Sequence, residues 1–458
     1  MKKPLLWLLI MLLSVSMIAT FSLAGCKKEA APVEEEVVEE AAAEEVVEEE
    51  AAPAEEPYPS TISGKVECMT PFTGGASAEG IELVAAKFRE AYPNIELTMI
   101  PKSGEEAWTS VLTNLASNNP WDVIIYWPKG FSQPLVDQGL VAPLTDIFKA
   151  TKFDEIAKGS YDVARYIGKG DTPYNVPINS HMFAVFYNVA KFKEAGIDKE
   201  PETWDEFLAD CKMLMDKGIY PIGKNTGDAG LPHWSWMDKF MNRTLADDSY
   251  RKQLMVGEGS WDTPEFRNAD NYWDDIMPYW NPDSATAQYG DAYAMFARGD
   301  IAMQCIGSWI CGPYEVEMGM KPIDDYNAFL FPEIDPSIPM AETVSSNCIL
   351  LSNAKKDNIA AQAWIAFWCR PEISKLFNDY IKTVSPISSA SSSHPILNKL
   401  LEESKNRPLY FQWLMDTEVH GLIDKEVESR SLGNITQDEE IINITKVITD
   451  WKAKKSEK

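Results

Sequence analysis

Residues 65–100 read KVECMTPFTGGASAEGIELVAAKFREAYPNIELTMI, and the pattern of this stretch decides the fold class. Lys65–Thr70 is predicted to be a strand. Apolar residues then recur at helical spacing from Ile81 to Phe88, and Tyr92-Pro93 ends that run. Ile95–Ile100 is predicted to be the next strand.

The alternation of strand and helix continues along the chain. A helix is predicted at Glu105–Ser117 and a strand at Asp122–Trp127. A further helix, Thr203–Met215, begins with a capping box formed by Thr203 and Glu206. Such repeats indicate an α/β protein with a parallel sheet and helices on both faces, whose ligand lies beyond the carboxyl ends of the strands.

The second half of the chain has elements of the same kinds. Ala285–Arg298 is predicted to be a helix that ends at Gly299, and Ile301–Ile306 is predicted to be a strand. Ile359–Trp368 is a predicted helix that Pro371 helps to close. The chain from Ile396 onward is predicted to be largely helical.

Length and charge limit the class of protein. A chain of 458 residues exceeds one ordinary compact core, so two packed lobes are expected. The formal net charge is −28, and the chain remains acidic when its acidic amino-terminal segment is set aside. Nucleic acids and anionic membrane surfaces bind basic proteins, so we expect neither as a partner of the folded body.

Residues 1–26 are typical of a bacterial export signal. Lys2 and Lys3 precede an almost unbroken apolar run from Leu5 to Ala24. The run ends in LAGC at 23–26, which resembles the lipobox of bacterial lipoproteins and predicts lipidation of Cys26. An uncleaved transmembrane anchor is the alternative. Both alternatives leave the rest of the chain outside the cytoplasm and attached to a membrane.

Residues 27–57 are predicted to be a disordered tether. Positions 29–56 hold 13 Glu and no basic residue, so like charges repel one another and no apolar face is available for folding. A segment of this length spans on the order of 30 Å as a random coil. An acidic docking tail is the alternative.

Cysteine and histidine spacing gives no sign of a metal or redox site. No two of the other six cysteines have C-x-x-C spacing, and they are predicted to be mostly buried free thiols, although Cys305 and Cys311 are close enough for a local bridge. Those six are Cys68, Cys211, Cys305, Cys311, Cys348 and Cys369. The four histidines also lack metal-ligand spacing, and no cofactor is expected.

Several tryptophans stand beside turn-forming or polar residues. The clearest cases are Trp127-Pro128, HWSW at 233–236 and GSW at 307–309, which are interpreted as lying at the ends of strands. A flat aromatic ring covers the apolar C–H face of a pyranose, and polar side chains bind its hydroxyl groups. Packing in a core or between lobes is the alternative for each tryptophan, and we prefer it for Trp121 and Trp236.

Three ordered segments resemble a known family. The first is PWDVIIYW at 120–127 with LVAPLT at 140–145. The second runs from VP at 176–177 through FYN at 186–188 and FKEAGI at 192–197 to PETWDEF at 201–207. The third is Ala292–Trp309. Together they resemble the sugar-binding proteins of ABC importers that are related to the maltose-binding protein, over nearly all of residues 60–400.

The resemblance implies a two-lobed periplasmic-binding-protein fold, with hinge strands and a ligand cleft between the lobes. The first lobe is predicted at 58–177 and 344–388, and the second at 178–343 and 389–458. The lobes would close around one sugar or oligosaccharide without chemistry on it. A monomer would then deliver the carbohydrate to the permease subunits of the importer.

Matching positions give the expected ligand contacts. They are Trp127, Lys129, Asn179, Ser180, His181, Trp234, Trp309, Ser346 and Asn347. Relatives often have an acidic residue where this chain has His181, and they stack aromatic rings on the sugar near Trp234 and Trp309. The alternatives are a structural histidine at 181, a surface lysine at 129 and a simple hinge bend at 345–347.

A secreted glycoside hydrolase is the enzyme alternative. Such an enzyme needs two carboxylates about 5–10 Å apart, but the adjacent pairs Asp247-Asp248 and Asp274-Asp275 point apart on a helix or strand. The chain also lacks the G-x-S-x-G, H-E-x-x-H and Walker motifs, so no enzymatic activity is predicted. A peptide, polyamine or metal is the alternative cargo, and a carboxylate-lined cleft would favour the polyamine.

Overall fold

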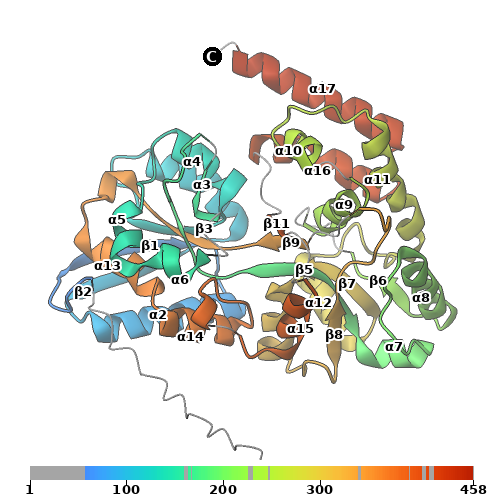
Figure 1. The fold of residues 1–458 in the computed structure, drawn as a ribbon, viewed down its shortest axis with the longest axis horizontal. Coiled ribbons are helices and arrows are strands. Elements are labelled where there is room, and N and C mark those ends of the chain that lie inside the picture. Colours follow the sequence, from blue (N-terminus) through green and yellow to red (C-terminus); the bar gives the residue numbers. More distant parts are fainter. Residues whose placement is uncertain are drawn as a thin grey trace, which may run out of the picture. The chain divides into compact units, whose positions relative to one another are not determined.

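The computed structural model describes residues 57–158, 163–166, 168–224, 231–245, 248–338, 342–390, 392–404, 409–411 and 417–456. These residues belong to one compact unit, Glu56–Lys458. The predicted export signal, Cys26 and residues 27–56 of the tether lie outside the described residues. The described strands form two sheets (Figure 1).

The first sheet has the strand order β2-β1-β3-β10-β4. Its strands are β1 (Gly64–Thr70), β2 (Ile95–Pro101), β3 (Val123–Tyr126), β4 (Val176–Pro177) and β10 (Cys348–Leu351). As predicted, β1 pairs with β2 and β3 in parallel. Strand β10 runs antiparallel to both β3 and β4, which makes this sheet mixed.

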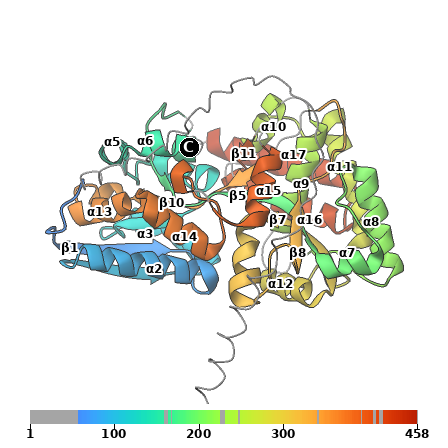
Figure 2. The same cartoon turned by 60° about the horizontal axis from the view of Figure 1, so that its bottom comes forward.

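Helices cover both faces of the first sheet, as predicted. Val123 and Ile125 of β3 belong to one core, with α2, α5, α6, α13 and α14, whereas Ile124 and Tyr126 face a second core with α3 and α4. The helices are α2 (Gly75–Ala91), α3 (Gly104–Leu115), α4 (Gln133–Asp137), α5 (Thr145–Thr151), α6 (Phe153–Ile156), α13 (Ile359–Trp368) and α14 (Pro371–Ile381). Although far apart in the sequence, α2 and α14 lie side by side (Figure 2).

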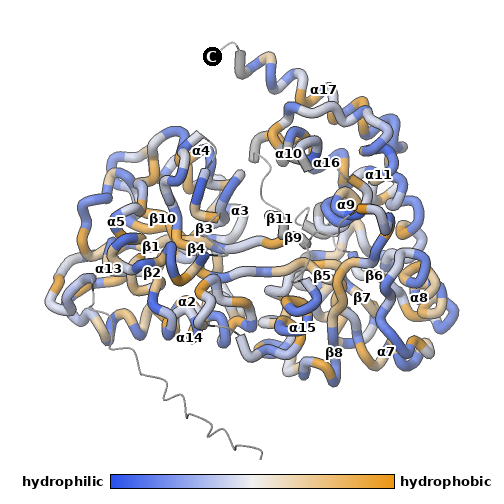
Figure 3. Tube along the Cα trace, in the orientation of Figure 1, coloured by the Kyte–Doolittle hydropathy of each residue, from blue (hydrophilic) through white to orange (hydrophobic). Residues whose placement is uncertain are grey.

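The second sheet has the order β11-β9-β5-β7-β6, and β8 also pairs with β5. Its strands are β5 (His181–Asn188), β6 (Tyr220–Ile222), β7 (Ile301–Gly307), β8 (Tyr326–Phe329), β9 (Glu342–Ser345) and β11 (Leu409–Phe411). Every residue of β7 is buried, and the strand is largely hydrophobic in Figure 3. The predicted strand Ile301–Ile306 is therefore confirmed.

Helices also pack on both faces of the second sheet. Val185 of β5 faces one core, and its neighbours Ala184 and Phe186 face another. The helices are α7 (Val189–Ala195), α8 (Trp204–Asp216), α9 (Leu231–Thr244), α10 (Asp248–Met255), α11 (Pro264–Ile276), α12 (Tyr289–Arg298), α15 (Pro395–Ser404), α16 (Thr417–Ser431) and α17 (Gln437–Ser456). None of the helices in the described ranges is long and apolar enough to cross a bilayer.

Some local predictions were right and others were wrong. The capping box of Thr203 and Glu206 begins α8 as predicted, and the six described cysteines are buried free thiols. Helix α12 begins at Tyr289 and not at Ala285, because Gln288 and Asp291 form a capping box there. Helix α13 has the predicted bounds, and Pro371, which follows its C-cap Cys369 by two residues, is the first residue of α14.

The chain passes between the two sheets at three places. Residues 178–180 connect β4 to β5, residues 346–347 connect β9 to β10, and residues 382–394 connect α14 to α15. The first two crossings are the strand-to-strand passages that the family resemblance implies. The exact limits of the four lobe segments, at 177/178, 343/344 and 388/389, stay predictions.

A cluster of polar side chains attaches the third crossing to the second sheet. Glu315 accepts hydrogen bonds from Tyr326 Oη, at 2.7 Å, and from His394 Nε2, and its other oxygen lies 3.7 Å from Lys382 Nζ. Burial raises the pKa of Glu315, but the bonds from His394 and Tyr326 and the nearby positive charges outweigh it. The net pKa lies below the ordinary value of 4.5.

Glu315→Gln is expected to destabilise the protein by about 1–2 kcal/mol at pH 7, because it weakens hydrogen bonds to a charged acceptor. A carboxylate with a lowered folded-state pKa stabilises the fold above its unfolded pKa, and that stabilisation is lost as pH falls through the folded pKa. The deficit of the variant should therefore shrink between pH 5 and pH 3 in urea unfolding curves.

The control is Glu82→Gln, which removes an exposed ion pair with Arg89 and should cost under about 1 kcal/mol. A Glu315→Gln deficit that persists unchanged at pH 3 would show that lost packing, and not the lost charge, causes it.

Candidate functional site

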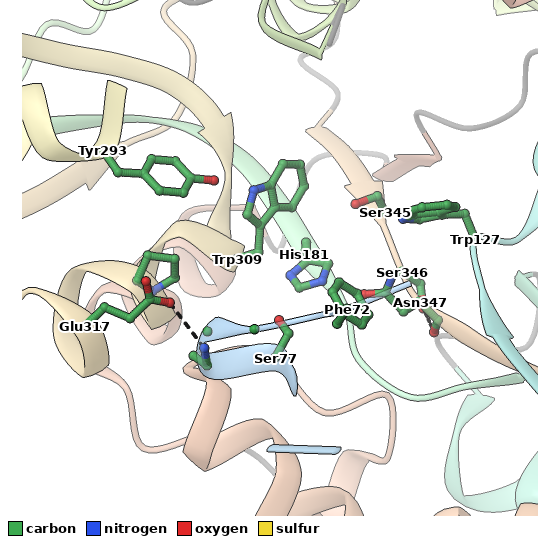
Figure 4. Close-up of a pocket in the computed structure, with 14 residues that line it drawn as sticks. Phe72, Ser77, Trp127, His181, Tyr293, Trp309, Glu317, Ser345, Ser346 and Asn347 are labelled. Carbon is green, nitrogen blue, oxygen red and sulfur yellow. Dashed lines mark hydrogen bonds between the residues drawn. The ribbon is translucent and has the colours of Figure 1, made fainter. Parts of the chain in front are cut away.

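A cavity of about 290 Å³ lies where the elements of the two sheets meet, and many of the predicted contact residues line it. Trp127, His181, Trp309, Ser346 and Asn347 come together in this cavity (Figure 4). Trp127 follows β3, His181 begins β5 and Trp309 follows β7. Ser346 and Asn347 form the second crossing. The volume is at the lower end of the range that small-molecule pockets occupy.

Trp309 forms one wall of the cavity. It lies in a single helical turn, Ser308–Ile310, directly after β7, and its ring is half-buried. The ring meets His181 edge-on, with centroids 5.3 Å apart, and Phe183 edge-on at 5.1 Å. A Cβ atom at Gly307 would lie 1.9 Å from this ring, so a glycine is needed for the indole to fold back over the chain.

Trp127 lines the cavity from the other sheet. It directly follows β3, its ring is half-buried, and it packs 5.2 Å from the Tyr126 ring and 5.7 Å from the Phe131 ring. Ser132 Oγ donates a hydrogen bond to the carbonyl oxygen of Trp127 and fixes the backbone at this bend. Figure 4 shows His181 and Ser345 between the two tryptophan rings.

His181 is the buried polar group of the cavity. The residue is 4% exposed, and its Nδ1 has no hydrogen-bond partner among the described residues. Burial lowers its pKa to about 4, against a smaller opposing effect of a hydrogen bond with Asn347. The imidazole is therefore neutral at neutral pH, with both a donor and an acceptor nitrogen.

Asn179 and Asn347 join the first two crossings. Asn179 Nδ2 donates to Asn347 Oδ1 at 3.0 Å, and the backbone nitrogen of Asn347 donates to Asn179 Oδ1 at 2.6 Å. Ser346 Oγ donates to the carbonyl oxygen of Asn179 at 2.6 Å. Ser180 N donates to the carbonyl of Val384, which brings in the third crossing. Asn179 and Ser180 thus hold the crossings and do not line the cavity.

Comparison with known proteins identifies the family. The model of the bacterial extracellular solute-binding proteins matches residues 74–375. The chain belongs to this family. An uncharacterised ABC transporter extracellular-binding protein of Pyrococcus horikoshii is 26% identical over 341 residues, which cover 72% of this chain and 74% of that protein.

Two further members of the comparison differ in the ligand that they are named for. The sn-glycerol-3-phosphate-binding periplasmic protein UgpB of Brucella abortus is 25% identical over 154 residues, covering 32% of this chain and 36% of its own. The structure of the bacterial solute receptor AcbH, described as having an exclusive preference for β-D-galactopyranose, has a TM-score of 0.76 at 16% identity. It covers 86% of this chain and 99% of AcbH, and this likeness shows the two-lobed α/β fold.

Besides Asn179 and Ser180, the predicted contact Lys129 of this solute-binding protein lies apart from the cavity lining. Lys129 donates its Nζ proton to the carbonyl of Arg165 at 3.1 Å. The HWSW stretch was expected beside a strand end, but it lies in α9, where Trp236 is fully buried in a core as predicted. The side chain of Trp234 lies outside the described residues. Trp121 packs, half-buried, against the core beneath α3 and α4.

The cavity also contains residues that sequence reasoning missed. Phe72 and Gly74–Ser77 follow β1, so the strand-end rule applied to Trp127 would have found them. Tyr293 and Glu317 had no such signal, because they come from α12 and from the short π-helical turn η5 (Pro313–Glu317). Their approach to the cavity depends on tertiary packing.

The acidic pairs considered for hydrolysis have structural partners or lie outside the described residues. Asp274 accepts a hydrogen bond from Arg430, and Asp275 accepts one from Trp204 Nε1, both at 2.9 Å. Asp247 and the side chain of Asp248 are not among the described residues. Within the described ranges, no three His, Cys, Asp or Glu side chains gather as a metal site.

His181→Gln is expected to change the pH dependence of stability. The folded pKa of about 4 lies below the ordinary value of 6.5, so the unfolded state binds more protons between these values. Wild-type protein should lose up to about 3 kcal/mol of unfolding free energy as pH falls from 6.5 to 4, and the variant should lose less.

Urea unfolding at half-unit pH steps measures this difference. A constant gap between wild type and His181→Gln from pH 7 to pH 4 would contradict a buried neutral imidazole at this position.

Proposed function

We propose that this protein is the lipid-anchored, extracytoplasmic receptor of an ABC importer, that it binds a sugar or oligosaccharide between its two lobes, and that it delivers this ligand to the permease. The observation that carries the proposal is the cavity between Trp127 and Trp309, which also holds His181, Ser345 and Asn347. Family membership supports the role of a receptor outside the cytoplasm.

The chemistry of the lining suits a carbohydrate. Indole rings cover the C–H face of a pyranose, and the hydroxyl, imidazole and amide groups of Ser345, His181 and Asn347 donate and accept hydrogen bonds with its hydroxyls. A neutral imidazole is suited to this task because it offers one donor and one acceptor. The name of the structural neighbour AcbH also favours a sugar, although that likeness concerns the fold.

Lobe closure gives a physical mechanism for transport. Three crossings connect the sheets, and the cavity residues come from elements of both. A ligand that touches both lobes binds the closed arrangement more tightly than the open one, and it shifts the equilibrium by this difference in affinity. We propose that the permease recognises the closed form and that the receptor acts as a monomer.

The other functions that we considered have less support. Hydrolysis needs two carboxylates across the scissile bond, whereas Glu317 is the one carboxylate among the described lining residues. A single lining carboxylate does not favour a polyamine either, because a polyamine carries several positive charges and would need several carboxylates. We therefore expect no release of reducing sugar from glycosides by the purified protein.

Trp309→Ala is expected to weaken sugar binding by about tenfold to a hundredfold, because the ligand loses the aromatic surface on one of its faces. Intrinsic fluorescence and calorimetric titration with glucose, galactose, N-acetylglucosamine, maltose and raffinose would measure the change for whichever sugar binds. The melting temperature should fall as well, because the ring packs against the buried Phe183, so affinities are compared at a temperature at which both proteins are folded.

The matched control is Trp108→Ala, which removes an indole that is 43% exposed and lies outside the cavity lining. Unchanged affinity in Trp309→Ala would remove this tryptophan from the binding site.

Cys26→Ser tests the lipid anchor. Without the thiol no lipid can be attached, so the protein should lose incorporation of labelled palmitate. It should be recovered as an unprocessed precursor or as a released protein, and not as the lipidated membrane form. Lys28→Ala, two residues away, should behave like wild type. If Cys26→Ser remains labelled and membrane-bound, lipidation at this cysteine is wrong.

A further inference from the structure

Glu317 reaches from the second lobe to the amino end of α2. Helix α2 is 17 residues long, and its N-cap is Gly74, which has no side chain to bind the first amide groups. Ala76 N donates a hydrogen bond to Glu317 Oε1 at 3.2 Å, and Figure 4 shows this contact at the edge of the cavity. The carboxylate thus occupies the partly positive end of the helix dipole.

The backbone at Gly75 provides the room for this contact. Its φ is +71°, and a Cβ atom there would lie 2.6 Å from Glu317 Oε1. An L-residue would therefore be strained by its own backbone and would also collide with the carboxylate oxygen. The glycine at this position fits the close approach of Glu317 to the helix.

This contact lies within the proposed binding cavity. Gly74, Gly75, Ala76 and Glu317 line the same space as Trp127 and Trp309. No Lys or Arg occurs among the described lining residues. His181 adds no positive charge at neutral pH, since burial lowers its pKa to about 4.

The carboxylate and an anionic ligand would compete for the same donors. A phosphate or carboxylate on the ligand would be attracted to the α2 amides, which are a general anion-binding arrangement. Glu317 already accepts from one of them, Ala76 N. Its negative charge would repel a second anion in the cavity, whose described lining has no basic side chain. A neutral sugar does not meet this repulsion.

We propose that Glu317 determines the charge specificity of the cavity, which takes uncharged carbohydrates and excludes sugar phosphates and uronic acids. This inference rests on the proposed function and narrows its substrate class. A preference for uncharged ligands would distinguish this chain from the sn-glycerol-3-phosphate-binding protein of Brucella abortus, to which it is 25% identical over about a third of this chain. Glu317 acts here as a selectivity residue and takes part in no reaction.

Binding of matched ligand pairs tests the proposal. The pairs are glucose with glucose 6-phosphate and with glucuronate, galactose with galacturonate, and glycerol with sn-glycerol 3-phosphate. Wild type is expected to bind a neutral member at least about a hundredfold more tightly than its anionic partner. Isothermal titration measures both dissociation constants. Low salt is chosen because it screens the repulsion between the ligand and Glu317 least.

Two substitutions separate the charge of Glu317 from its contact with α2. Glu317→Gln retains an oxygen that accepts from Ala76 N and removes only the charge, so it should reduce the preference for the neutral ligand over the anion by about tenfold or more. Glu317→Ala removes the acceptor as well and leaves the α2 amides free for an anion, so it should reduce the preference further.

Glu79→Gln is the matched control. Glu79 is an exposed residue of α2 itself, outside the cavity lining, and its side chain accepts from Tyr380 Oη. The substitution makes the same change in net charge. The neutral-to-anion preference should stay at the wild-type value in this variant.

The possible results distinguish this inference from the proposed function. If wild type binds a neutral sugar but Glu317→Gln leaves the preference unchanged, or matches Glu79→Gln, the charge role of Glu317 is wrong while the sugar receptor stands. If wild type binds glucose 6-phosphate or a uronate more tightly than its neutral partner, the charge inference is overturned while the sugar receptor stands. If it binds only sn-glycerol 3-phosphate, both are overturned. If no member of a wider mono- and oligosaccharide panel binds, the sugar receptor fails and this inference fails with it.

Discussion

The reciprocal amide bonding between Asn179 and Asn347 is the constraint on which the rest of the binding architecture depends. Both side chains are buried, and each residue supplies a donor and an acceptor to the other, so neither crossing can shift without leaving a buried amide group unpaired. The bond from Ser180 to Val384 adds the third crossing to the same point. The three crossings thus meet in one small hydrogen-bonded region, and the bond from Ala76 to Glu317 is a further contact between the two lobes.

This region also explains the position of the cavity. His181 follows Ser180 at the start of β5, and Ser345 and Ser346 precede Asn347, so residues that hold the crossings are neighbours in sequence of residues that line the cavity. Trp309 is then positioned against His181 by the antiparallel pairing of β5 with β7. A ligand here contacts the pivot of the two lobes as well as their faces, which makes binding and lobe movement interdependent.

Local sequence predicted the parts of the fold that local physics controls. Strands β1 to β3 and the Thr203 capping box followed from alternation, helical spacing and cap chemistry, which act over a few residues. The HWSW stretch failed because its polar and aromatic composition resembles a loop, whereas tertiary burial of Trp236 stabilises a helix. Trp127, His181 and Trp309 were found from strand ends and the family motif. Glu317 was not, because its partner Ala76 is distant in sequence and no pattern in either segment records the contact.

The short turn η5 carries two carboxylates, one that contacts the third crossing and one that contacts the cavity. Glu315 is held by His394, Tyr326 and Lys382 at the third crossing, whereas two residues later Glu317 extends to α2 of the other lobe. A helical turn this short cannot move one carboxylate far without moving the other. If the lobes separate, the bond from Ala76 to Glu317 breaks, whereas Glu315 can remain attached on its own side. The exposed carboxylate then faces the cavity with its charge no longer balanced by the helix amides, so the open form should repel anions at least as strongly as the form described here.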